Sequence, residues 1–221
     1  MRMQTRSLLG EELKALRHEL TLMSSMVEED LGKSLAYLRE GSEELEKEVK
    51  ESGKKVDALQ LKIEDMALIL IATQQPVARD LRELITVFKI TASLERIGDY
   101  GLHLLKAAKK LSGRAPFHSI EQIETMAETG QKMLKAAFSA YLTQDPDAAR
   151  KAAAMDETID NEHKTLTEEV LALMKEKHKL IKPAARLLKL SGYMERLGDH
   201  ITSICEGVIF MVKGRHEELN H

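Results

Sequence analysis

A short motif that combines two acids, a base and a glycine occurs twice in the 221-residue chain. It reads Glu-Arg-Ile-Gly-Asp at residues 95–99 and Glu-Arg-Leu-Gly-Asp at residues 195–199. Residues four apart share one face of a helix, so each copy places two carboxylates side by side. Like charges at this spacing repel each other. We therefore expect a bound cation, a basic partner or screening by solvent to compensate each pair.

Further acids directly follow apolar residues that recur at helical spacing. Each of these acids lies beside the apolar stripe of its predicted helix. Where two antiparallel helices lie side by side, acids on the same side of their stripes can converge, so the sequence predicts two groups of acids. The first group is Asp57, Glu95 and Asp99, and the second is Asp156, Asp160, Glu195, Asp199 and Glu206. Converging carboxylates suit hard or borderline cations such as iron, manganese, magnesium or calcium. A solvated acidic flank with scattered salt bridges is the alternative that spacing leaves open.

The glycine of the motif favours the first interpretation. Gly98 and Gly198 both fall inside predicted helices, where glycine costs about 0.5–1 kcal/mol relative to alanine. Its presence at both positions implies that a neighbouring backbone packs closely there or that a ligand approaches.

The elements that must position these acids are all predicted to be helices. Leu, Ala, Lys, Glu and Met dominate the chain, whereas aromatic residues make up 4% and Trp is absent. This composition favours helix over strand, and apolar residues recur every three or four positions, as they do from Leu13 to Leu31. Glycine and proline breaks predict six helices, at 7–39, 43–73, 77–112, 117–143, 146–177 and 183–213.

The two halves of the chain align with each other. An offset of 100 residues (195 − 95) superposes the two motifs and also pairs Lys89 with Lys189 and Thr91 with Ser191. Three predicted helices precede the linker at 113–116 and three follow it. We therefore expect an all-α fold of two tandem three-helix bundles related by duplication, at residues 1–113 and 117–214, with a tail at 215–221.

Composition excludes several classes of function. The net charge is −3, from 33 basic and 36 acidic side chains, and this argues against binding nucleic acid or an anionic membrane surface. No apolar run approaches the 18–20 residues or so of a membrane span, and residues 1–10 do not resemble a signal peptide. The single cysteine, Cys205, excludes an internal disulfide. We expect a soluble cytoplasmic protein.

No set of residues predicts a catalytic or an organic-cofactor site. Cys205 has no cysteine partner and is expected to pack as a small apolar residue. His103 follows Asp99 by four and is expected to be a surface histidine rather than a ligand, while His200 is expected to point elsewhere. A glycine loop of the Gly-x-x-x-x-Gly-Lys type, which cradles phosphate, is absent from the sequence. We therefore expect a protein that is not an enzyme.

The chain resembles the PhoU family of phosphate-signalling regulators. The resemblance rests on the two motifs, on Pro-Val-Ala-Arg-Asp-Leu-Arg at 76–82 and on the double three-helix plan, and it extends from about Leu13 to Gly214. It implies two similar three-helix bundles. In some family members, Glu/Asp-x-x-x-Asp motifs on the bundle surface bind multinuclear iron or zinc clusters. By resemblance these motifs are Glu95/Asp99, Glu195/Asp199 and Asp156/Asp160.

The first half departs from this pattern at two positions. Gly53 stands where the second half has Asp156, and Lys106 stands where it has Glu206. The first half therefore carries fewer acids, and the metal site, if there is only one, is predicted at Glu195 and Asp199.

The resemblance also implies a regulatory role. PhoU-like proteins repress the phosphate-starvation response and are thought to couple the ATPase subunit of the phosphate transporter to a sensor histidine kinase. A homodimer is plausible for such a protein. One alternative is a carboxylate-bridged metal enzyme or an iron-storage bundle, but such proteins need Glu-x-x-His pairs in a bundle core, and the only one here is Glu218–His221. A purely structural helical scaffold is a third option.

Overall fold

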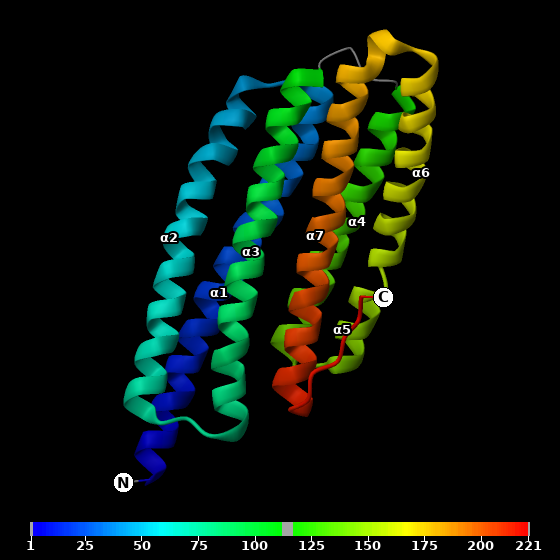
Figure 1. The fold of residues 1–221 in the computed structure, drawn as a ribbon. Coiled ribbons are helices and arrows are strands. Elements are labelled where there is room, and N and C mark those ends of the chain that lie inside the picture. The colour runs from blue at the N-terminus through cyan, green and yellow to red at the C-terminus, as the bar shows by residue number, and fades with distance from the viewer. Residues whose placement is uncertain (1, 112–116, 221) are drawn as a thin grey trace.

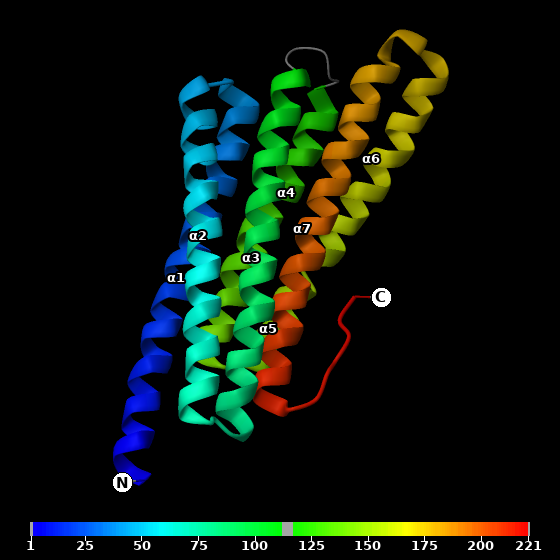
Figure 2. The same ribbon diagram turned by 60° about the vertical axis from the view of Figure 1, so that its left-hand side comes forward.

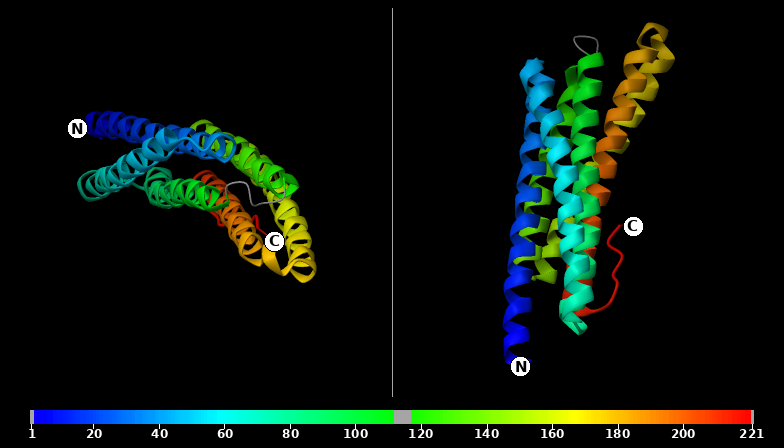
Figure 3. Two further views of the ribbon diagram at one scale, coloured as in Figure 1. Left: turned by 90° about the horizontal axis from the view of Figure 1, so that it is seen from above. Right: turned by 90° about the vertical axis from the view of Figure 1, so that its left-hand side faces the viewer.

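The structure is a computed structural model that describes residues 2–111 and 117–220. All regular structure in these residues is helical, and the long helices run side by side (Figure 1). The elements are α1 (Arg2–Glu40), α2 (Glu43–Gln74), α3 (Ala78–Leu111), α4 (Phe117–Thr143), α5 (Pro146–Ala153), α6 (Asp156–Glu176), the 3₁₀ helix η1 (His178–Leu180) and α7 (Ile181–Lys213). Seen from above, they follow a curved arc, with α1–α3 towards one end and α4–α7 towards the other (Figure 3).

The first bundle forms because α1, α2 and α3 each carry one apolar stripe. Leu16, Leu20, Met23 and Val27 on α1 are fully buried at the spacing that the sequence predicted, and Ile63 of α2 is buried with them. Burial of each such side chain stabilises the fold by about 1.5–3 kcal/mol relative to exposure. The predicted seam of this bundle is therefore confirmed.

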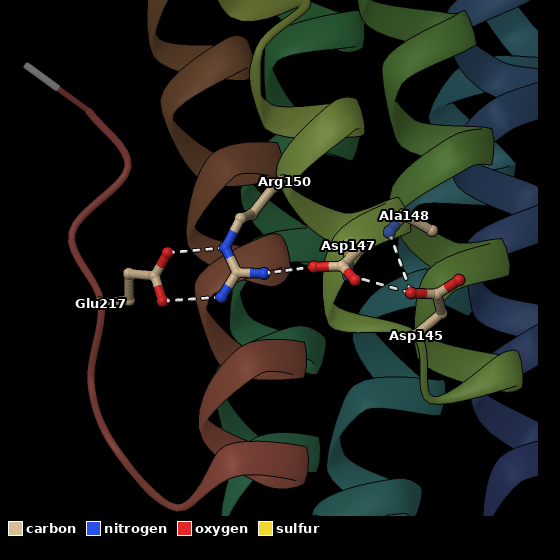
Figure 4. Close-up of polar contacts among 5 residues, drawn as sticks. All are labelled: Asp145, Asp147, Ala148, Arg150 and Glu217. Atoms are coloured by element: carbon tan, nitrogen blue, oxygen red, sulfur yellow. Dashed lines mark hydrogen bonds and ion pairs between the residues drawn. The ribbon is translucent and has the colours of Figure 1, made fainter.

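The predicted fifth helix, 146–177, was wrong in one respect, because two helices stand in its place. Asp145 caps α5, since its Oδ1 accepts hydrogen bonds from the backbone N–H groups of Asp147 (2.9 Å) and Ala148 (3.1 Å) (Figure 4). The helix ends in a tight turn in which Met155 N donates to Ala152 O (3.1 Å). No glycine or proline marks this turn, so the sequence pattern continues through it. The turn sets Asp156 at the start of α6.

The last helix begins two residues earlier than predicted, at Ile181 rather than at Pro183. Pro183 lies in its first turn, where backbone N–H groups have no partner inside the helix, so the missing N–H of proline costs nothing there.

The two bundles meet along α3 and α7, the helices that carry the repeated motif (Figures 1 and 2). Thr86 Oγ1 donates to the Gly207 carbonyl (3.3 Å) and Lys89 Nζ pairs with Glu206 (3.1 Å). The all-α fold with two related bundles is confirmed. The boundaries at 113 and 117 stay predictions, and residues 112–116 lie outside the described residues. No described helix is long and apolar enough to cross a membrane.

The segment after α7 folds back along the second bundle. Gly214 ends α7 in a left-handed conformation (φ 70°), which glycine adopts at little cost. Arg150 of α5 then holds Glu217 through two hydrogen bonds of 2.7 and 2.9 Å (Figure 4), and the rings of Phe210 and His216 stack at 4.4 Å.

Candidate metal centre

Four acids of the second half gather between α6 and α7, and we call them the second acidic set. They are Asp156 and Asp160 on α6 and Glu195 and Asp199 on α7. Burial raises the pKa of Asp160 and of Glu195, and the charge of Asp199 raises both further. Such mutual repulsion shows that the carboxylates lie near one another, as the sequence predicted.

Asp156 is the most deeply placed of the four. Its side chain is 5% exposed, and burial, followed by the charges of its acidic neighbours, raises its pKa to about 7. One oxygen, Oδ2, accepts a hydrogen bond from Thr202 Oγ1 (3.0 Å). The other oxygen, Oδ1, is buried without a hydrogen-bond partner among the described residues. A buried carboxylate oxygen normally has a partner, and this oxygen lacks one.

Gly198 makes room for this carboxylate. A Cβ on residue 198 would overlap Asp156 Oδ1 and would also meet Ile159 Cδ1 at 3.3 Å. A neighbouring backbone or a ligand was predicted at the motif glycine, whereas at Gly198 the close neighbour is the side chain of Asp156. At Gly98 a Cβ would meet only Val27 and Val56, at the ordinary contact distances of 3.7 and 4.0 Å. The prediction does not hold there.

Glu206 and Asp199 are engaged with other groups. Glu206 pairs with Lys89 of α3 (3.1 Å) and accepts a hydrogen bond from Leu219 N (3.2 Å). Asp199 accepts a hydrogen bond from Asn220 Nδ2 (2.6 Å). The C-terminal segment therefore reaches the edge of the second acidic set, and Glu206 is turned towards the junction between the bundles.

The acids predicted for the first half also come together. Asp57, Glu95 and Asp99 line a pocket of about 360 Å³ between α2 and α3, and we call them the first acidic set. Burial, and then Asp99, raise the pKa of Glu95. Cations share this pocket, because Lys50, Lys54 and Lys106 line it as well. The first acidic set is thus partly balanced by nearby positive charge.

A fourth acid of this pocket, Asp30, was missed. It comes from α1, is 3% exposed, and burial raises the pKa of its carboxyl to about 6. It lines the same pocket as Gly53, the position where the duplicated half has Asp156. Each half therefore holds one buried carboxylate, Asp30 beside the first acidic set and Asp156 within the second. The signal was present in the sequence: steps of three and four from Leu13 through Val27 reach residue 30, where an acid replaces the expected apolar residue.

The acidic sets are not ready-made metal cages. Among the side chains that the structure describes, no three from His, Cys, Asp or Glu are arranged to hold a metal ion as they stand. The donor chemistry of the second acidic set nonetheless fits a cation, because its carboxylates lie on two neighbouring helices and one buried oxygen has no partner.

Cys205 and His163 have ordinary surroundings, whereas His103 does not. Cys205 is buried and free, as expected, and burial raises the pKa of its thiol to about 12. His163 Nδ1 lies 2.6 Å from Ser191 Oγ at the edge of the core. His103, expected on the surface, is instead half-buried and stacks on Tyr193, with 4.8 Å between ring centroids.

Comparison with known proteins agrees with the resemblance. The PhoU domain family model matches residues 20–108 and 123–208. A phosphate-specific transport system accessory protein PhoU homolog of Clostridium acetobutylicum is 31% identical over 98% of this chain and 99% of its own length. A homolog of the same description from Caulobacter vibrioides is 34% identical over 95% of this chain and 91% of its own length.

The fold agrees with solved structures too. The crystal structure of PhoU from Pseudomonas aeruginosa matches with a TM-score of 0.88 at 29% identity, covering 93% of this chain and 99% of that one. PhoU from Streptococcus pneumoniae matches with the same TM-score at 26% identity, over 96% of this chain and 100% of that one. These comparisons place the chain, a duplicated helical protein with an acidic set in each half, in a class of regulatory proteins rather than among enzymes. The chain belongs to the PhoU family, whose members are accessory proteins of phosphate transport.

Proposed function

We propose that the chain is a negative regulator of the phosphate-starvation response and of phosphate uptake. It acts in the cytoplasm as an adaptor between the ATPase subunit of a phosphate transporter and a sensor histidine kinase. The observation that carries this proposal is the match to PhoU over the whole chain, in both sequence and fold. Long helical faces without a catalytic set of side chains suit an adaptor.

An exposed apolar surface on α2 supports docking of a partner protein. Leu61, Leu68 and Ile69 are 64%, 54% and 61% exposed, and Val77 just beyond the helix is 73% exposed. Leu61 and Leu68 lie seven residues apart and therefore share one face of α2, and exposed apolar side chains on one face are typical of interaction sites. We assign the α2 surface (Leu61, Leu68, Ile69 and Val77) to the transporter ATPase.

A binding experiment tests the adaptor proposal. The purified chain should bind the ATPase subunit encoded in the same genome, and Leu68→Asp/Ile69→Asp should weaken binding at least ~10-fold, which corresponds to about 1.4 kcal/mol. Leu171→Asp, which changes an exposed apolar side chain of α6 in the other bundle, is the matched control and should bind as the wild type does. Absence of binding to both the ATPase subunit and the kinase would refute the adaptor role.

We further propose that the second acidic set holds a metal ion or cluster, iron or zinc by family resemblance. Asp156, Asp160, Glu195 and Asp199 would hold it, with Glu206 joining if it leaves Lys89. The first acidic set, Asp57, Glu95 and Asp99, would bind more weakly because Lys50, Lys54 and Lys106 stand beside it. Bound metal would supply positive charge that relieves the repulsion among the carboxylates.

Elemental analysis of protein purified without chelator tests the metal proposal. Glu195→Ala/Asp199→Ala should lower metal content well below that of the wild type, whereas the matched Glu95→Ala/Asp99→Ala should lower it less. Equal metal content in the wild type and in Glu195→Ala/Asp199→Ala would refute the assignment. We also propose that the chain forms a homodimer. Light scattering of the purified protein measures its molecular mass and so tests this.

A further inference from the structure

A basic pocket lies where α3 and α7 meet, and it shares Lys106 with the pocket of the first acidic set. Its volume is about 570 Å³, and its walls carry four cations and two rings: Lys106, Lys110, Arg186, Lys189, His103 and Tyr193. No carboxylate lines it among the described residues. This concentration of positive charge stands out in a chain whose net charge is −3.

The internal duplication shows which residues stand at the equivalent positions of the other half. At one end of the α3–α7 contact, Lys89 pairs with Glu206 at 3.1 Å. The 100-residue offset carries this pair onto Lys189 and Lys106, which both line the basic pocket at the other end. The positions that hold an ion pair in one copy therefore hold two positive charges in the other.

Two further substitutions add positive charge to the same place. Lys110 corresponds to Phe210 under the same offset, and Arg186 corresponds to Thr86. The Arg186 guanidinium donates a hydrogen bond to the Lys110 carbonyl and is therefore held at the pocket. No described carboxylate lines the pocket to balance these four cations. Their mutual repulsion is left to solvent or to a ligand.

Two stacked rings form one wall of the pocket. His103 and Tyr193 stack with 4.8 Å between centroids and 22° between planes, and Lys189 Nζ lies 5.6 Å from the centre of the Tyr193 ring. His103 Nδ1 is buried and has no hydrogen-bond partner among the described residues. Lys189 therefore lies against this wall.

We propose that the basic pocket binds an anion that carries several linked phosphoryl groups. Lysine and arginine are the side chains that recognise phosphoryl oxygens, and a multivalent anion gains most from several converging cations. Four cations at one site match a ligand with three or four negative charges better than a single orthophosphate ion. An inorganic oligophosphate and the phosphate tail of a nucleotide share this chemistry.

Titration calorimetry of the full chain tests the proposal, with EDTA present so that metal does not mediate binding. Inorganic triphosphate should bind more tightly than orthophosphate, and its affinity should fall as salt is raised. Lys106→Glu, which restores the Lys–Glu pair of the other copy, should weaken triphosphate binding at least ~10-fold. Lys135→Glu changes the same charge on the exposed face of α4 and should leave the affinity unchanged.

A second variant and a second ligand make the result specific. Lys106 also borders the first acidic pocket, so Lys189→Gln is the second variant, and it should also weaken binding. ATP that binds more tightly than triphosphate identifies a nucleotide as the ligand, and ATP that binds more weakly identifies a free oligophosphate. Far-ultraviolet circular dichroism should show that every variant is folded.

Three results would overturn the proposal. They are no binding of triphosphate at millimolar concentration, unchanged affinity in Lys189→Gln and in folded Lys106→Glu, and equal weakening in Lys135→Glu. None of these bears on the binding of the transporter ATPase, so the adaptor proposal is tested separately.

Discussion

The carboxylate of Asp156 lies in the space that a Cβ on residue 198 would occupy. The glycine of the second motif is therefore explained by the acid that packs against it. The glycine of the first motif, Gly98, has no such neighbour, and its buried acid, Asp30, comes from α1 instead. The two copies of the motif thus look alike in sequence and differ in what they accommodate.

Alanine at the two motif glycines should have opposite effects on stability. Gly198→Ala should displace Asp156 and lower the free energy of unfolding by about 1–3 kcal/mol, as overpacking does. Gly98→Ala meets only ordinary contacts and should raise it by about 0.5–1 kcal/mol, because alanine is the better helix former. Urea denaturation at neutral pH measures both.

A double mutant tests whether the stability lost in Gly198→Ala comes from overlap with Asp156. In an Asp156→Ala background, Gly198→Ala should cost much less than it does alone, because the overlapping atoms are gone. An unchanged cost in that background would show that Ile159 or the helix itself is responsible.

Asp156 should make stability depend on pH. Its pKa rises from about 3.8 to about 7 on folding, so the native state binds this proton more tightly than the unfolded chain does. The stability that the protonated group contributes is present below about pH 4 and is lost as the pH rises towards 7. In metal-free protein, Asp156→Asn should therefore be more stable than the wild type at pH 8 by about 1–3 kcal/mol, with little difference at pH 4.

The matched control for this experiment is Asp65→Asn, which changes an exposed carboxylate on α2. Its stability should follow that of the wild type across the same range. If Asp156→Asn shows the same pH dependence as the wild type, another group is responsible.

The C-terminal segment should be released by one substitution. Arg150→Met removes both hydrogen bonds to Glu217 and should speed amide hydrogen exchange in residues 215–220, including the Leu219 N–H that Glu206 accepts. Lys151→Met, on the exposed side of the same helix, should leave exchange unchanged. Equally slow exchange in Arg150→Met would show that the stacking of Phe210 on His216 suffices to hold the segment.

Much of the fold follows from the sequence because its periodicity is unbroken over long helices. The seam residues of α1 and the convergence of Asp57 with Glu95 were predictable from spacing alone. The turn between α5 and α6 was not, because Ala154 and Met155 are ordinary helix residues. Asp30 was overlooked because Leu31, its neighbour, satisfies the apolar pattern equally well. His103 was misplaced because its partner, Tyr193, lies 90 residues away, on the other bundle.

The central claim is that this chain represses phosphate uptake genes when phosphate is plentiful. The most direct measurement is expression of those genes in phosphate-rich medium, in a strain that lacks the chain and in the same strain with the chain restored. The account predicts high expression in the first strain and repression in the second, with weaker repression by Leu68→Asp/Ile69→Asp. Expression that stays low when the chain is removed would contradict the account.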